Sequence, residues 1–142
     1  MKNLMTNCIL AAVALAVMAG SASAQILKAD IPFTFHAGKT LMLPGTYEVN
    51  LGASATRSYF LLRNVDTNTA VLLAAYIRTD IPKEWQAEGS PKVAFECTDG
   101  RCILRNLWSG SDTDMYRFQG PKPGRDGDLH VTEITMTRAK AD

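Results

Sequence analysis

Side chains that commonly carry catalysis are sparse in this chain of 142 residues. Its two histidines, His36 and His130, stand in no nucleophile motif such as Gly-x-Ser-x-Gly. Because nucleophilic catalysis usually needs a histidine base beside the nucleophile, we expect both to be surface or structural residues. Paired carboxylates could hydrolyse a glycosidic bond, but only at a separation that the sequence does not define. A small hydrolase is therefore the least favoured function, and we expect no enzyme.

Two aspartate pairs resemble fragments of calcium-binding loops: Asp112–Asp114 and Asp126–Asp128. Neither is accompanied by the other ligands and the final glutamate of a twelve-residue calcium loop. Aspartate and glycine are also favoured in turns, and this alternative explains both segments. We expect no metal and no cofactor, and we keep Asp126 and Asp128 as weak candidates for binding.

Trp85 and Trp108 are the other weak candidates for binding. Exposed tryptophans stack on sugars and anchor protein partners, although a tryptophan beside a core strand more often packs inside the protein. The loop at residues 119–128, rich in glycine and proline, is the better place to look for function, because long loops on β scaffolds commonly carry it.

Residues 1–24 have the three parts of a secretory signal peptide. Lys2 gives a positive start, Cys8–Ala19 is an unbroken apolar run, and Ala22–Ala24 is a small-x-small cleavage motif. The run is shorter than the roughly 20 residues of a membrane-spanning helix, so cleavage after Ala24 is favoured over an uncleaved anchor. The sequence predicts a protein exported to the periplasm or the extracellular space, without stable membrane insertion after cleavage.

Loss of Cys8 with the signal leaves Cys97 and Cys102, an even pair in an oxidising compartment, which favours a disulfide. Asp99-Gly100 favours a type I′ hairpin turn, which places the two cysteines opposite each other at a Cα separation of about 4.5 Å. Their spacing differs from the Cys-x2-Cys of thioredoxin-type and zinc sites. A redox switch is the remaining alternative. We expect the disulfide to point into the core.

Residues 25–142 form, by prediction, a single β domain with a polar C-terminal tail. Removal of Lys2 leaves 14 of the 15 basic residues against 14 acidic ones. Such a neutral chain has no long-range field that would steer it to nucleic acid.

Period-two alternation of apolar residues predicts seven or eight short strands, and hence an all-β antiparallel sandwich or small barrel. The expected strands are Ile31–His36, Thr46–Leu51, Ser58–Asn64, Thr69–Thr79, the two arms of a hairpin over Lys92–Trp108, Met115–Phe118 and Leu129–Thr137. Because Pro32 cannot donate to a ladder, we expect the first strand to lie at an edge or to begin there. The last strand has a mixed pattern that suggests a bulge.

Two segments have competing interpretations. Ala70–Ile77 is apolar on both faces, which predicts a central strand covered on each side, with helix as the alternative. Asp80–Gly89 is the one short helix expected after the signal, with Asp80 as its cap, Pro82 in its first turn and Gly89 at its end.

The stretch Ile31–Gly38, followed by Leu43-Pro44-Gly45-Thr46-Tyr47-Glu48-Val49, resembles a family of short exported proteins common in acidobacteria. Their pattern is I-P-F-x-F followed by L-P-A-G-T-Y-x-V. This chain lacks the alanine between Pro44 and Gly45, and its cysteine hairpin is not part of the pattern. The resemblance spans roughly residues 31–108 and implies no catalytic or binding residue; its motifs concern folding.

These observations favour an exported, non-enzymatic β domain that binds a partner or serves as an envelope component. Its partner would be an envelope protein, a glycan or a small apolar ligand. The main alternative is a small β-barrel carrier of an apolar ligand, which would need a closed internal cavity.

Overall fold

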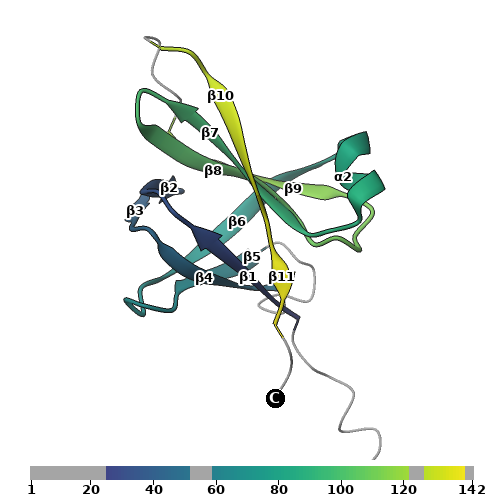
Figure 1. The fold of residues 1–142 in the computed structure, drawn as a ribbon, viewed down its shortest axis with the longest axis horizontal. Coiled ribbons are helices and arrows are strands. Elements are labelled where there is room, and N and C mark those ends of the chain that lie inside the picture. Colours follow the sequence, from purple (N-terminus) through teal and green to yellow (C-terminus); the bar gives the residue numbers. More distant parts are fainter. Residues whose placement is uncertain (1–24, 52–58, 122–126, 140–142) are drawn as a thin grey trace, which may run out of the picture.

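The structure is a computed structural model that describes residues 25–51, 59–121 and 127–139. Figure 1 shows that these residues form strands and one short helix, which confirms the predicted all-β class. The elements are β1 (Ile26–Ile31), β2 (Phe35–Ala37), β3 (Thr40–Met42), β4 (Gly45–Asn50), β5 (Tyr59–Asn64), β6 (Ala70–Thr79), α2 (Lys83–Glu88), β7 (Lys92–Thr98), β8 (Arg101–Trp108), β9 (Met115–Phe118), β10 (His130–Thr135) and β11 (Thr137–Arg138). The predicted signal peptide lies outside the described residues.

The strands form two layers that share strands at their corners. The strand order is β10-β7-β8-β9-β6-β5-β4-β1-β11. β6 belongs to both layers, because Ala70–Ala74 pairs with β5 and Ala75–Thr79 pairs with β9. β10 and β11 end the order on opposite sides, yet Met136 alone separates them in the chain. Figure 1 shows them as one yellow band that crosses both layers.

The space between the layers is filled with side chains. Tyr47, Val49 and Leu51 all face inward from one side of β4 and its end, as their alternation predicts. Phe35 meets the rings of Tyr47 and Phe95 edge to face, at centroid distances of 5.2 and 5.1 Å. The void enclosed by the core residues measures about 10 Å³, room for one water molecule at most.

The hairpin of β7 and β8 has the predicted register from the turn to the pair Phe95–Leu104, beyond which a bulge shifts it by one residue. Cys97 pairs with Cys102 and forms the predicted disulfide, with the Cα atoms 4.1 Å apart. Asp99 and Gly100 both have positive φ, 44° and 77°, as a type I′ turn requires. Cys97 is only 1 % exposed and belongs to the main core, which confirms the inward direction of the disulfide.

Loss of this disulfide should lower the free energy of unfolding by about 2 kcal/mol. This value is at the low end of the usual range, because the loop that the disulfide closes is very short. Urea denaturation of the wild type with and without reductant measures the effect. The double variant Cys97→Ala/Cys102→Ala is the control, since reductant should not change its unfolding. A wild type whose unfolding is insensitive to reductant would contradict the prediction.

The first predicted strand, Ile31–His36, is wrong in its bounds. β1 ends at Ile31 and β2 begins at Phe35, with Pro32 in the connection between them. Proline has no N–H to donate to a ladder, so pairing stops there and the chain passes to the other layer. β2 then pairs parallel with β8, which departs from the predicted all-antiparallel arrangement. Interruptions of this kind also raise the strand number to eleven among the described residues.

β6 is a strand, as predicted, but it is not covered on both faces. Leu73 points inward and is 5 % exposed, whereas Leu72 and Tyr76 point outward and are 58 % and 53 % exposed. The outer face of β6 is apolar although it is exposed to solvent. The prediction of burial on both faces, which rests on this apolar composition, is therefore wrong. Pro82, not Asp80, occupies the N-cap position of α2, without a side-chain capping bond; Gly89 ends the helix in the left-handed conformation, as predicted.

Candidate functional site

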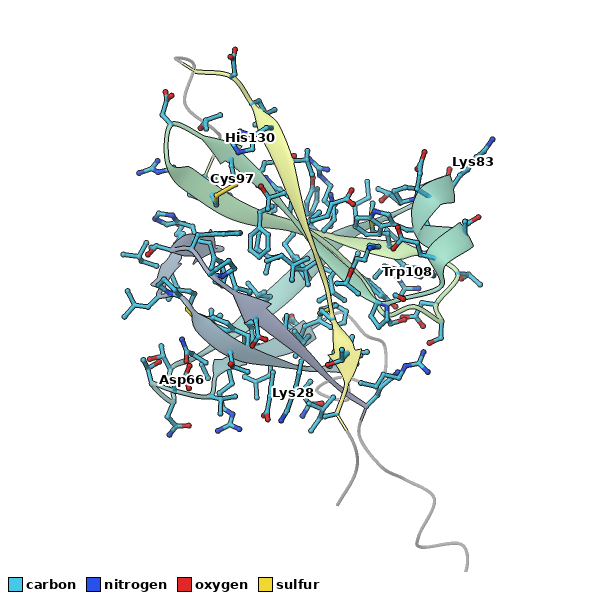
Figure 2. All side chains as sticks on the ribbon, in the orientation of Figure 1. Lys28, Asp66, Lys83, Cys97, Trp108 and His130 are labelled. Carbon is cyan, nitrogen blue, oxygen red and sulfur yellow. A yellow bond between two sulfur atoms is a disulfide. The ribbon has the colours of Figure 1, made fainter. Side chains whose placement is uncertain are left out.

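The two histidines do not come together. His130 lies on β10 opposite Cys97, and His36 lies on β2 beside Ile103 of β8. The order β10-β7-β8-β2 therefore separates them by three strand spacings, or about 14 Å. Figure 2 shows His130 near the disulfide end of the hairpin. At that separation the two side chains cannot act on the same bond.

The tryptophans pack inside the protein. Trp85 and Trp108 are 3 % and 4 % exposed and form a second small core with Ile81, Ala94 and Met115. The Trp108 indole N–H donates to the backbone oxygen of Asp112 at 2.9 Å. Figure 2 shows Trp108 at the end of the molecule where α2 lies. Of the two interpretations of these residues, the structure shows the packing one.

The aspartate segments take part in loop structure where they are described. The Asp112 carboxylate accepts a hydrogen bond from the Tyr116 hydroxyl at 3.2 Å. The backbone N–H of Asp112 donates to Ser109 Oγ. Asp128 is exposed, and Asp126 lies outside the described residues. Within the described ranges, no three histidine, cysteine, aspartate or glutamate side chains gather closely enough to hold a metal ion.

An open groove lies beside β6, at the point where β9 stops pairing with it. β9 pairs with β6 as far as Phe118 opposite Ala75. Beyond it, the chain turns away toward β8: a Cβ on Gly120 would lie 2.8 Å from Ile103, and Arg105 Nη2 donates to the oxygen of Pro121 at 2.7 Å. No strand in the described parts of the chain pairs with the edge of residues 71–74 that faces away from β5.

The groove measures about 560 Å³ and has three walls. They are the β6 edge at residues 71–74, the turn at residues 37–40 between β2 and β3, and residues 119–121. The size lies in the range of known binding sites. The third wall is the start of the loop that the sequence favours for function.

A second hollow adjoins the groove at Gln119 and Gly120, which line both. It contains Arg105 and Arg117, whose guanidinium groups each contact a different oxygen of the Glu96 carboxylate at 3.1 Å. The Arg105 side chain is 9 % exposed and that of Arg117 is 35 % exposed. Lys39 lines the groove itself, and among the described residues none that lines either hollow is acidic. The combined surface is therefore positive.

A buried polar cluster near the start of β4 has a structural role. The Tyr47 hydroxyl donates to the backbone oxygen of Leu43, and Asn64 Nδ2 donates to that hydroxyl at 3.1 Å. Burial raises the pKa of Tyr47, an effect partly opposed by the Asn64 hydrogen bond, so the phenol stays protonated as a donor. A Cβ on Gly45 would lie 2.9 Å from an Asp66 carboxylate oxygen. The Leu-Pro-Gly-Thr-Tyr motif thus builds a corner of the fold.

No helix in the described residues has both the length and the apolar character needed to span a membrane. Comparison of the chain with protein-family models, with curated proteins and with solved structures finds no match. The groove and the adjoining arginine hollow are thus the candidate site on their geometry alone. Sequence reasoning missed Lys39, Arg105 and Arg117, because these residues are scattered along the chain and only the fold gathers them.

Proposed function

We propose that this chain is an exported, non-enzymatic binding domain that takes an extended segment of another protein into the groove beside β6. The observation that carries the proposal is the strand edge at residues 71–74, which pairs with no strand in the described ranges and forms one wall of that groove. An extended segment can pair with the backbone N–H and C=O groups of such an edge, while its side chains pack against the walls. An extended polypeptide is the ligand class whose backbone can supply hydrogen-bond partners along such an edge.

The residues of β6 support this role. Ala70–Ile77 contains no charged residue and no proline, the usual devices that protect an exposed edge. β10 is the contrasting case, because its unpaired edge belongs to a strand that carries Glu133. An edge that is left open, apolar and recessed is typical of a docking position for a strand.

Export rests on two supports. The signal pattern at residues 1–24 predicts it, and the Cys97–Cys102 disulfide is compatible with an oxidising compartment. The partner would then be an envelope or extracellular protein. The near-neutral charge of the chain argues against nucleic acid.

The other functions have less support. A carrier of an apolar ligand would need an internal cavity, and the void in the core holds about 10 Å³. A glycan site built on Trp85 or Trp108 would need an exposed ring, and both rings are buried. A hydrolase would need polar groups that converge on one bond, and His36 and His130 lie on different strands with two others between them.

Peptide selection tests the proposal. A library of random peptides displayed with free C-termini is selected against the purified full-length protein, and the affinities of resynthesised peptides are measured by calorimetry. Leu72→Glu should weaken binding by at least about tenfold, because it places a charge beside the groove. Val131→Glu is the matched control, since Leu72 and Val131 are both 58 % exposed. Equal binding by the two variants, or a selection that yields no saturable binder, would contradict the proposed function.

A further inference from the structure

We infer that the segment taken up beside β6 is the C-terminal end of a partner protein, added parallel to β6 with its carboxylate toward Arg117. This inference rests on the proposed function and names its ligand. Three features carry it: where the groove is closed, what charge surrounds the closed end, and how deeply the edge is recessed.

The groove is closed at one end by β9. Phe118 occupies the position opposite Ala75, so a strand added along residues 71–74 meets β9 there and cannot continue along β6. Four residues of free edge match an added segment of about four residues. A polypeptide that continued would have to bend sharply out of the groove, whereas a chain that ends at this point needs no bend.

The charge at the closed end selects the kind of chain terminus. Gln119 and Gly120 mark the border between the groove and the arginine hollow, whose lining contains Arg105 and Arg117 and, in the described ranges, no acidic residue. A terminal amine would be repelled there, whereas a carboxylate would accept charge-assisted hydrogen bonds. Because β6 runs from Ala70 to Thr79, a C-terminus beside Ala75 means that the added strand runs parallel to β6.

Arg117 is the better placed of the two arginines to bind the carboxylate. Arg105 already donates to Glu96 through Nε and to the backbone oxygen of Pro121 through Nη2. Among the described residues, Arg117 has one hydrogen-bond partner, Glu96, which it contacts through Nη2. Arg117 is also the more exposed of the two arginine side chains. Its remaining N–H groups have no partner among residues 25–51, 59–121 and 127–139 and could donate to a ligand.

The recess favours a chain end over a second copy of this protein. The edge lies between the turn at residues 37–40 and residues 119–121. A second β6 is flanked by the same two walls, so pairing two copies edge to edge would bring wall against wall. A free C-terminal segment is one strand wide and has no such walls.

The experiment uses one peptide obtained from the random library and resynthesised in four forms. Two forms differ at the C-terminus, which is a free acid or an amide. The other two are free acids with N-methyl groups on alternate residues, one on the odd-numbered and one on the even-numbered positions. Binding to the full-length protein is measured by calorimetry. We expect the acid to bind about tenfold more tightly than the amide. N-methylation in one register should weaken binding strongly and in the other only slightly, since one edge of the added strand faces β6.

Variants then locate the carboxylate. Arg117→Gln should reduce the affinity for the acid to that for the amide and leave the affinity for the amide unchanged. Arg117→Lys should retain part of the preference, and Arg101→Gln, on the exposed turn of the β7–β8 hairpin, should retain all of it. Equal affinity for acid and amide would overturn the inference and leave the proposed function standing. Insensitivity to N-methylation in both registers, or the absence of binding by every form, would overturn both.

Discussion

Glu96→Gln should lower the free energy of unfolding by about 3 kcal/mol, the effect expected when a largely buried ion pair loses one partner. The Glu96 carboxylate holds both Arg105 and Arg117, one through each oxygen. Arg105 is 9 % exposed, so water cannot replace the lost counter-charge. The variant keeps the size of the side chain and removes its charge, which leaves the guanidinium of Arg105 without compensation in the outer surface of the β7–β8 hairpin.

Urea denaturation measures this effect, with Glu133→Gln as the control. Glu133 is an exposed carboxylate on β10, in the strand next to β7 and opposite Ala94, so its loss should change stability by no more than about 0.5 kcal/mol. The same Glu96 variant should bind the free-acid peptide more tightly than the wild type, because the hollow becomes more positive. A stability change no larger than that of the control would refute the role assigned to Glu96.

Asn64→Ala should cost about 3 kcal/mol, because it removes three hydrogen bonds, each worth about 1 kcal/mol. Asn64 is 1 % exposed; its Nδ2 donates to the Tyr47 hydroxyl, and its Oδ1 accepts the backbone N–H groups of Asp66 and Thr67. One side chain therefore joins β4 to the turn that follows β5. Its loss removes these three hydrogen bonds at once.

A double-mutant cycle with Tyr47→Phe tests that explanation. Tyr47→Phe removes the hydroxyl that Asn64 contacts and should cost about 1.5 kcal/mol by itself. Because the two side chains share a hydrogen bond, the double variant should lose less than the sum of the single variants. Strict additivity would show that the two side chains act independently. Thermal and urea unfolding of the four proteins provide the comparison.

Much of the local structure could be predicted from short stretches of sequence. Asp99-Gly100 identifies the hairpin turn, and the turn places Cys97 against Cys102. The alternation around Tyr47 identifies the inward face of β4, and Gly89 marks the end of α2. Each of these depends on residues only a few positions apart, whose conformational preferences act without knowledge of the rest of the chain.

The candidate site is of the opposite kind. Lys39, Val71, Arg105, Arg117 and Gly120 come from four separate parts of the chain and meet only because β9 leaves β6 after Phe118. The same cause explains the wrong burial prediction for β6. An apolar strand looks central in sequence, yet its neighbours in the sheet decide whether its faces and edges are covered.

By itself, the sequence determined the all-β class, the stapled hairpin, the turns and the inward positions of most strands, because side-chain periodicity and turn chemistry are local properties. It also predicts export through residues 1–24, which stays a prediction, as does the resemblance to the acidobacterial family. Only the tertiary structure decided which strands pair, where β6 lacks a partner and which cations gather beside that gap. Strand pairing joins residues far apart in the chain, and no local preference specifies it.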